Sequence, residues 1–357
     1  MTLIIAEAGV NHNGDEKLAF ELVDAAYEAG ADIVKFQTFK ATSLVTSHAK
    51  QADYQIENTN KVESQLDMLS RLELSYEAHH ELVKHCNSLG IQFLSTAFDI
   101  ESLDFLVEEL NLNMLKLPSG ELTNAPLVLA HARTGCDIIV STGMATLSEI
   151  EMALGVIAFG YLNESSTSPS IEDFQLAYAS EKGQAILKEK VSILHCTTEY
   201  PAPFDEINLR AMDTLKNSFC LNAGYSDHSQ GIAIPVAAVA RGASIIEKHF
   251  TLDKKMEGPD HKASLEPHEL SEMVTAIRNV ENALGSAVKS PSRSELKNKV
   301  IARKSLVCSK AIKKGQILTA EHLAIKRPGN GMSPYKYWDV IGKESSIDYE
   351  AGDLINE

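Results

Sequence analysis

Two lysines lie within short apolar runs of the kind that form buried β-strands. Lys35 and Gln37 are two residues apart in "IVKFQT", so their side chains share one face of a strand, and Lys116 lies in "MLKLPS". An ammonium group inside a protein needs a negative partner. Glu7 and Glu121 could supply it in structural ion pairs, or a multiply charged ligand could lie between the lysines. We favour the ligand, because the chain is otherwise strongly acidic.

Hydroxyl side chains end several other apolar runs. Two following loops, "PSGE" and "STGM", lead into stretches with helical periodicity, and the N–H groups at a helix N-terminus favour phosphate. Hydroxyls beside lysines add the neutral donors that a phosphate needs. The pattern therefore predicts a phosphorylated acid as substrate, bound by the hydroxyls of Thr96, Ser119, Ser141 and Ser226.

Two histidines end the last two runs, "GYSDHS" and "IEKHF". His228 and His249 could bring two imidazoles onto one divalent metal if their strands are neighbours, with positions left open for water and a substrate carbonyl. A histidine at a strand end is also commonly a hydrogen-bonded structural residue, so spacing alone leaves both readings open. Four further histidines lie in stretches predicted to be helical and are expected at the surface: His79, His80, His85 and His131.

The elements that must position these groups form a repeat of apolar run, polar break and helical stretch. Eight such runs occur before about residue 285: Leu3–Ala8, Asp32–Gln37, Ile91–Thr96, Met114–Ser119, Asp137–Thr142, Val191–Cys196, Leu221–Ser226 and Ser244–Phe250. Eight βα units over this length predict a (β/α)8 TIM barrel, whose active site lies at the C-terminal ends of the strands. A doubly wound open sheet is the alternative, because alternation alone does not show closure.

A change of composition marks a second domain. Residues 286–299, within "GSAVKSPSRSELKNK", are small, polar and basic, as in a linker. We therefore predict a barrel over residues 1–285 and a small domain over residues 300–357, whose glycines and prolines indicate short strands and turns.

Charge, hydropathy and cysteine content argue against several binding partners and several classes of protein. The formal net charge of −16 disfavours nucleic acid and anionic lipid, and no apolar run approaches the roughly 20 residues of a membrane helix. The five cysteines are scattered without a C-x-x-C pair, which argues against a disulfide framework. The opening run lacks the basic flank of a secretory signal. We therefore expect a cytoplasmic protein.

Ten segments, spread in order over essentially the whole chain, resemble the bacterial N-acetylneuraminate (sialic acid) synthase family. They are "IIAEAGVNHNGD", "VKFQTF", "FLSTAFD", "KLPSGE", "VSTGMA", "LHCTTEYPAPF", "GYSDHS", "IEKHFTLDK", "GPDHKASLEP" and "KRPGNG". The resemblance implies a TIM barrel followed by an antifreeze-like (SAF) domain. It also implies a homodimer in which that domain covers the partner's barrel mouth, so that Arg327 reaches the partner's active site.

The resemblance further implies a role for each matching residue. Catalytic roles fall to Glu7, Lys35, Lys116, Glu121 and His249, and phosphoenolpyruvate would contact Lys35, Thr96, Lys116, Ser119, Ser141 and Ser226. The amino sugar would contact Gln37, Glu121, Tyr200 and Asp260, and His228 with His249 would hold Mn2+, or alternatively Mg2+ or Co2+. Thr198 stands where some members carry an asparagine near the phosphate, and Ile301 stands where some carry a phenylalanine lining the sugar pocket.

The implied reaction condenses phosphoenolpyruvate with an N-acetylated amino sugar. Within the family, "CTTEYPAPF" and "GPDHKASLEP" resemble the branch that converts 2,4-diacetamido-2,4,6-trideoxymannose into N,N'-diacetyllegionaminic acid and phosphate. The alternative substrate is N-acetylmannosamine, which gives N-acetylneuraminate. Two other functions remain open from the residues: an aldolase that uses Lys35 or Lys116 as a Schiff base, and a non-enzymatic sugar- or ice-binding protein.

Overall fold

The computed structural model describes residues 1–59, 61–163 and 168–356. Within them the chain forms two compact units, Met1–Gly285 and Ser286–Glu357. In the described part of the chain, no helix combines the length and apolar character needed to span a membrane. None of the five cysteines there forms a disulfide.

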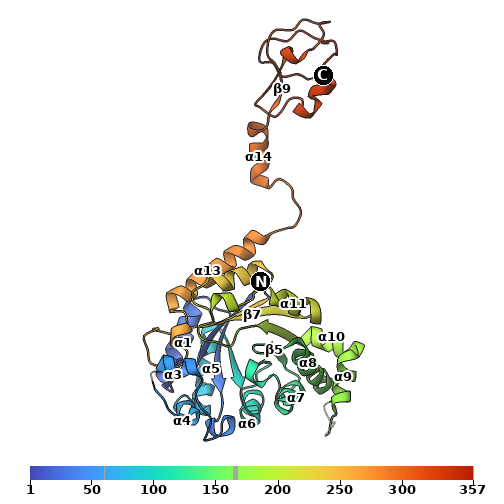
Figure 1. Ribbon diagram of the computed structural model, residues 1–357. Coiled ribbons are helices and arrows are strands. Elements are labelled where there is room, and N and C mark those ends of the chain that lie inside the picture. The colour runs from blue at the N-terminus through green and yellow to red at the C-terminus, as the bar shows by residue number, and fades with distance from the viewer. Residues whose placement is uncertain (60, 164–167, 357) are drawn as a thin grey trace. The chain divides into compact units, whose positions relative to one another are not determined.

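Eight parallel strands of the first unit close into a barrel in sequence order (Figure 1). They are β1 (Leu3–Gly9), β2 (Ile33–Thr38), β3 (Gln92–Ala97), β4 (Met114–Leu117), β5 (Asp137–Ser141), β6 (Val191–His195), β7 (Asn222–Asp227) and β8 (Ile245–His249). The barrel is closed because its last strand, β8, pairs with its first strand, β1, from Leu3↔Ile245 to Glu7↔His249. The predicted TIM barrel is confirmed, and the open-sheet alternative is wrong.

Helices surround the barrel between successive strands (Figure 1). Those that follow the βα repeat are α1 (Glu16–Glu28), α5 (Tyr76–Leu89), α6 (Ile100–Asp104), α7 (Ala125–Arg133), α8 (Leu147–Leu162), α9 (Ile171–Ala179), α10 (Glu181–Lys190), α11 (Ala211–Phe219), α12 (Ala233–Ala240) and α13 (Pro267–Leu284). Three short helices extend the connection after β2: α2 (Ala41–Leu44), α3 (Asp53–Thr59) and α4 (Gln65–Ser70). Local sequence determines where a helix begins. At the start of α8, Thr146 and Glu149 form a capping box.

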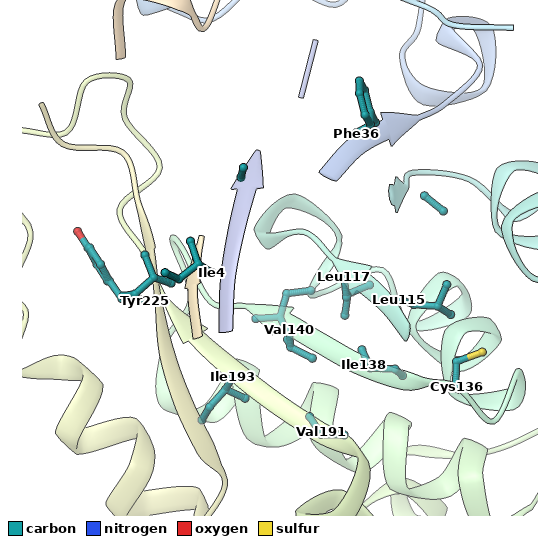
Figure 2. Close-up of a cluster of buried hydrophobic side chains, with 14 of the residues drawn as sticks. Ile4, Phe36, Leu115, Leu117, Cys136, Ile138, Val140, Val191, Ile193 and Tyr225 are labelled. Carbon is teal, nitrogen blue, oxygen red and sulfur yellow. The ribbon is translucent and has the colours of Figure 1, made fainter. Parts of the chain in front are cut away.

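Strand alternation divides the barrel residues into two apolar clusters. One face of each strand packs against the helices, as Figure 2 shows for Leu115, Leu117, Ile138 and Val140. The other face fills the barrel interior with a plug made of Ile5, Ile33, Leu94, Ile139, Leu194 and Ile245. Because side chains on one strand face recur every two residues, the next inward layer begins two positions further on. That layer is polar: it consists of Glu7, Lys35, Thr96, Ser141, Cys196 and Glu247.

Two of the four histidines predicted at the surface are instead fully buried. His79 on α5 bonds through Nε2 to Thr38 Oγ1 at 2.9 Å and through Nδ1 to the Ser75 carbonyl oxygen at 2.8 Å. His131 on α7 bonds through Nδ1 to the Leu127 carbonyl oxygen at 2.9 Å. Burial holds the pKa of both imidazoles below the usual value. They lie on the barrel-facing sides of their helices, where a neutral imidazole with a partner is tolerated.

The second unit has its own small core. Its elements are α14 (Arg293–Ala302), β9 (Ser305–Cys308), β10 (Leu323–Lys326) and α15 (Tyr337–Val340), with β9 and β10 antiparallel. Leu306, Ile312 and Tyr349 are among the residues that pack together in it. Helix α14 begins inside the segment predicted to be a linker, because Ser292 and Glu295 form a capping box there.

Gly224 lies where a side chain would collide with the interior plug. Its replacement therefore tests how tightly the barrel is packed. A Cβ on Gly224 would lie 2.5 Å from the Ile245 carbonyl oxygen and 2.6 Å from Leu194 Cδ2. Because the nearest obstacle is backbone, we expect Gly224→Ala to lower the free energy of unfolding by about 1–3 kcal/mol in urea denaturation. Gly120→Ala is the control, since its added methyl would meet no atom within 4 Å. Equal midpoints for both variants and wild type would show that the plug is loosely packed.

Candidate active site

One cavity of about 310 Å3 opens at the C-terminal ends of the barrel strands. It is lined by every residue of the predicted site that belongs to the first unit: Glu7, Lys35, Gln37, Thr96, Lys116, Ser119, Glu121, Ser141, Thr198, Tyr200, Ser226, His228, His249 and Asp260. The structure therefore brings these residues together. Their individual roles stay predictions.

Two lysines and two glutamates form a buried charge cluster at the cavity floor. Lys35 Nζ forms an ion pair with Glu7 and lies 3.4 Å from Glu247 Oε2. Lys116 Nζ lies 3.0 Å from Glu247 Oε1. All four side chains are at most 6% exposed. The structural pairing of Lys35 with Glu7 is thus present.

The pairing of Lys116 with Glu121 is wrong. Glu121 accepts a hydrogen bond from Asn124 Nδ2 at 2.7 Å instead, and Glu247 takes its place beside Lys116. Sequence reasoning assigned no role to Glu247, although it ends the same run as His249 and lies two residues before it on the same strand face.

Burial and the lysines act in opposite directions on the two glutamates. Burial raises the pKa of Glu7 to about 7, against the opposing effect of the Lys35 ammonium. Burial would also raise the pKa of Glu247, but Lys116 and Lys35 together hold that pKa well below its usual range. Burial would lower the pKa of Lys35, but Glu247 and Glu7 outweigh it and raise that pKa. The floor therefore holds Lys35 as an ammonium ion and Glu247 as a carboxylate, with Glu7 able to exchange a proton near neutral pH.

Hydroxyl groups beside this cluster form a cradle with unused hydrogen-bonding capacity. Ser119 Oγ accepts a hydrogen bond from the Gly143 N–H at 2.9 Å and lies 3.2 Å from Cys196 Sγ. Ser141 Oγ and Thr198 Oγ1 are buried without a hydrogen-bond partner. Since buried polar groups are normally satisfied, these hydroxyls indicate a polar ligand.

The cradle also depends on a glycine. A Cβ on Gly143 would lie 2.3 Å from Thr198 Oγ1 and 2.9 Å from Ser119 Oγ. Any other residue would therefore push into the hydroxyl cluster, so Gly143 allows the "STGM" backbone to approach it closely.

His228 and His249 lie side by side on the cavity wall, with ring centroids 5.6 Å apart. His228 Nδ1 lies 2.6 Å from the Thr197 carbonyl oxygen, which can only accept, so Nδ1 carries the proton and Nε2 has its lone pair available. His249 Nδ1 is buried without a partner. Burial lowers the pKa of His228 to about 4 and that of His249 well below its usual value, so both rings are neutral.

Two neutral imidazoles, one of them oriented by a carbonyl, are donors that suit a divalent transition metal. Among the described residues, no group of three or more histidine, cysteine or carboxylate side chains is arranged to hold a metal. Two protein nitrogens would leave room for water and a substrate carbonyl on such a metal, as Lewis acid catalysis requires.

Aromatic side chains line the cavity wall next to the two histidines. Tyr200 stacks on His228 with ring centroids 4.1 Å apart, and Tyr54 lies 5.1 Å from Tyr200. Sequence reasoning missed Tyr54, because it lies on α3, in the extension after β2 and far from any strand end. Asp260 lines the same wall, and burial raises the pKa of its carboxyl to about 6.

Arg327 and Ile301 belong to the second unit. Arg327 is exposed and its Nε donates to the Ala302 carbonyl oxygen at 3.1 Å, and Ile301 is exposed on α14. The role of Arg327 at the partner's active site and the place of Ile301 in the sugar pocket stay predictions.

Comparison with known proteins places the chain in a family. The NeuB family model matches residues 22–289, and the SAF domain model matches residues 303–357. The chain belongs to the NeuB family. The predicted C-terminal SAF domain is thereby confirmed, and the non-enzymatic alternative is wrong, because NeuB relatives are synthases.

Three NeuB relatives illustrate the similarity. The chain is 50% identical to the N,N'-diacetyllegionaminic acid synthase of Campylobacter jejuni, over 100% of this chain and 99% of that one. It is 44% identical to the enzyme of the same name from Legionella pneumophila, over 98% and 92% of the two chains. The crystal structure of the N-acetylneuraminic acid synthetase of Leptospira borgpetersenii matches with 32% identity and a TM-score of 0.65, over 83% of this chain and 90% of that one.

The shared carboxylate at the cavity floor gives a stability test. Glu247→Gln removes the charge that Lys35 and Lys116 share, and leaving a buried charge without its partner costs about 3–5 kcal/mol. We expect a loss of this size in the free energy of unfolding, measured by urea denaturation. Glu121→Gln is the matched control; because it alters only a hydrogen bond from Asn124, it should cost about 1 kcal/mol or less. If Glu247→Gln and Glu121→Gln lowered the free energy of unfolding by the same amount, the charge cluster would make no special contribution to stability.

Proposed function

We propose that this chain condenses phosphoenolpyruvate with 2,4-diacetamido-2,4,6-trideoxymannose to form N,N'-diacetyllegionaminic acid and phosphate. The observation that carries the proposal is one cavity holding two buried lysines, unused hydroxyls and two neutral histidines. The 50% identity to the Campylobacter jejuni synthase favours this substrate over N-acetylmannosamine.

The cavity floor binds phosphoenolpyruvate. Lys35 and Lys116 attract its phosphate and carboxylate, and Ser119, Ser141 and Thr198 donate hydrogen bonds to the oxygens. Thr96 and Ser226 complete the floor, where Thr96 Oγ1 already accepts from Lys35 at 3.1 Å and Ser226 Oγ donates to Glu247 at 2.8 Å. Because these donors are preorganised in a largely buried site, they stabilise the charge on the departing phosphate.

His228 and His249 hold the divalent metal, for which Mn2+ is our proposal and Mg2+ or Co2+ are alternatives. When bound, this ion supplies Lewis acidity toward the aldehyde of the open-chain sugar. The histidines contribute neutral donor nitrogens, and the Thr197 carbonyl fixes the tautomer of His228. The amino sugar contacts Gln37, Glu121, Tyr200 and Asp260 along the wall above.

The reaction then proceeds by carbon–carbon bond formation followed by loss of phosphate. The methylene carbon of phosphoenolpyruvate attacks the aldehyde carbon, whose oxygen takes up a proton to become a hydroxyl. An electron-deficient centre is left at the phosphate-bearing carbon. Water adds there and gives up a proton to a carboxylate. Glu7 suits this role because its pKa lies near 7, and Glu121 is the alternative. The tetrahedral adduct then expels inorganic phosphate between Lys35 and Lys116, and its added hydroxyl loses its remaining proton as it becomes the keto group of the product.

An aldolase mechanism through a lysine Schiff base is disfavoured. A Schiff-base lysine needs a depressed pKa to act as a nucleophile. The pKa of Lys35 is instead raised by Glu247 and Glu7, and Lys116 donates to Glu247 at 3.0 Å. Borohydride treatment in the presence of the keto-acid product should therefore trap no covalent adduct on Lys35 or Lys116.

The assembly and location complete the proposal. We propose a homodimer in which the SAF domain of one subunit covers the partner's barrel mouth and supplies Arg327 there. A cytoplasmic location agrees with the absence of disulfides among the described cysteines.

The substrate is tested by direct comparison of two sugars. Pure protein is incubated with phosphoenolpyruvate, Mn2+ and either 2,4-diacetamido-2,4,6-trideoxymannose or N-acetylmannosamine. Phosphate release and product mass are then measured. The proposal predicts faster release and the legionaminate mass with the first sugar; a preference for N-acetylmannosamine would assign the chain to the neuraminate-forming activity.

Lys116→Ala tests the role of the floor. We expect kcat to fall by about a hundredfold or more, because a preorganised charge is lost from the site of phosphate departure. The fold should persist, since Glu247 keeps its contacts with Lys35 and Ser226. Circular dichroism and kinetics with the preferred sugar check both statements. Lys17→Ala removes an exposed lysine on α1 and serves as control; wild-type turnover in Lys116→Ala would refute the assignment.

Asp260 predicts a pH dependence specific to the sugar. With its pKa near 6, the carboxyl is an acceptor for sugar N–H and O–H groups above that pH and loses this capacity as pH falls. Protonation of Glu7 below about pH 7 lowers kcat/KM for the sugar in every variant, so the wild type should fall by about tenfold per pH unit there and more steeply below the pKa of Asp260. Asp260→Asn should lower kcat/KM at neutral pH and keep only the limb of Glu7, without the steeper fall. An equally steep fall in both proteins would place the second titration on a group other than Asp260.

A further inference from the structure

A buried ion pair lies directly behind the two histidines, on the opposite face of the same strands. Glu247 and His249 of β8 line the cavity, so the intervening Lys248 points away from it. Asp227 likewise lies between Ser226 and His228 and points outward. Lys248 Nζ donates to Asp227 Oδ2 at 2.6 Å, and both side chains are fully buried.

The pair holds the backbone on both sides of His228. Lys248 Nζ also donates to the carbonyl oxygen of Ser229. Asp227 Oδ1 accepts hydrogen bonds from the Ser229 N–H at 3.0 Å and from Ser229 Oγ at 2.7 Å. The residues before and after His228 are therefore both tied to the residue before His249.

Stability alone does not account for such a pair. Burying two charges costs desolvation energy that their attraction repays only partly, so apolar residues of similar volume often serve a fold equally well. The residues that share the outer face of β7 and β8 with this pair, Tyr225 and Ile246, belong to the apolar core. An ion pair at this position, however, fixes the relative placement of two neighbouring strand ends, which apolar contacts define less sharply.

We infer that Asp227 and Lys248 are positioning residues that hold His228 and His249 at the separation needed to bind one divalent metal. The inference rests on the proposed metal site. Neither residue touches the metal or substrate; they act through the backbone of the histidines. Supporting residues of this kind typically change metal affinity by tenfold or more when they are replaced.

The test is a Mn2+ titration followed by electron paramagnetic resonance, with the full-length protein and no substrate. Asp227→Asn/Lys248→Met removes both charges together, so that no buried charge is left alone. We expect the dissociation constant of the histidine-dependent site to rise by about tenfold or more while the barrel remains folded. The His228→Ala/His249→Ala variant defines that site by subtraction.

Two further variants separate positioning from general stability. Asp213→Asn/Arg241→Met removes an exposed ion pair between the connections that flank β7 and should leave Mn2+ affinity unchanged. Ser229→Ala removes one hydrogen bond to Asp227 and should weaken Mn2+ binding in the same direction but less, which provides a readout if the double variant does not fold.

The outcomes distinguish this inference from the proposed function. If wild type binds Mn2+ at the histidines and Asp227→Asn/Lys248→Met and Ser229→Ala bind it equally well, the positioning role is overturned and the metal site stands. If wild type shows no histidine-dependent Mn2+ site, the proposed metal is wrong and this inference falls with it.

Discussion

The site depends on keeping two lysine side chains charged inside the mouth of a closed barrel. Lys35 and Lys116 are each 4% exposed, and a buried ammonium persists only beside negative charge. Glu247 supplies that charge to both lysines and Glu7 supplies it to Lys35. The result is a compact polar floor. When no anionic substrate is bound, Glu7 and Glu247 balance the positive charge of the two lysines. Glu7, with a pKa near 7, is the member whose charge can change most readily as a substrate arrives.

The barrel makes this arrangement possible because its strands contribute apolar side chains to the stabilising plug and, two residues later, polar side chains to the site. The plug of Ile5, Ile33, Leu194 and their neighbours fills the interior with apolar volume, and the polar layer begins two residues later. Closure places groups from different strands around one axis, so that Lys116 on β4 meets Glu247 on β8 without the two strands being neighbours. Hydroxyls from β5 and from the loop after β6, and histidines from the ends of β7 and β8, then share one cavity.

Much of this could be predicted from the sequence, because period-two patterns fix which strand residues point inward. Lys35 and Gln37, or Ser226 and His228, share a face whatever the rest of the fold does. The pairing of Lys116 could not be predicted, since it depends on which strands face each other across the barrel. Tyr54 was missed because it lies on an extension rather than a strand end. The burial of His79 and His131 depends on which helix face meets the barrel, and single polar residues on that face give no signal.

The most direct measurement is a crystal structure of the protein soaked with phosphoenolpyruvate alone. If the two ammonium groups exist to hold this anion, its phosphate and carboxylate oxygens will lie within hydrogen-bonding distance of both Lys35 Nζ and Lys116 Nζ, with Ser141 and Thr198 donating to them. Phosphoenolpyruvate bound elsewhere, with both lysines contacting only Glu7 and Glu247, would show that the cluster is structural and that the chemistry takes place at another site.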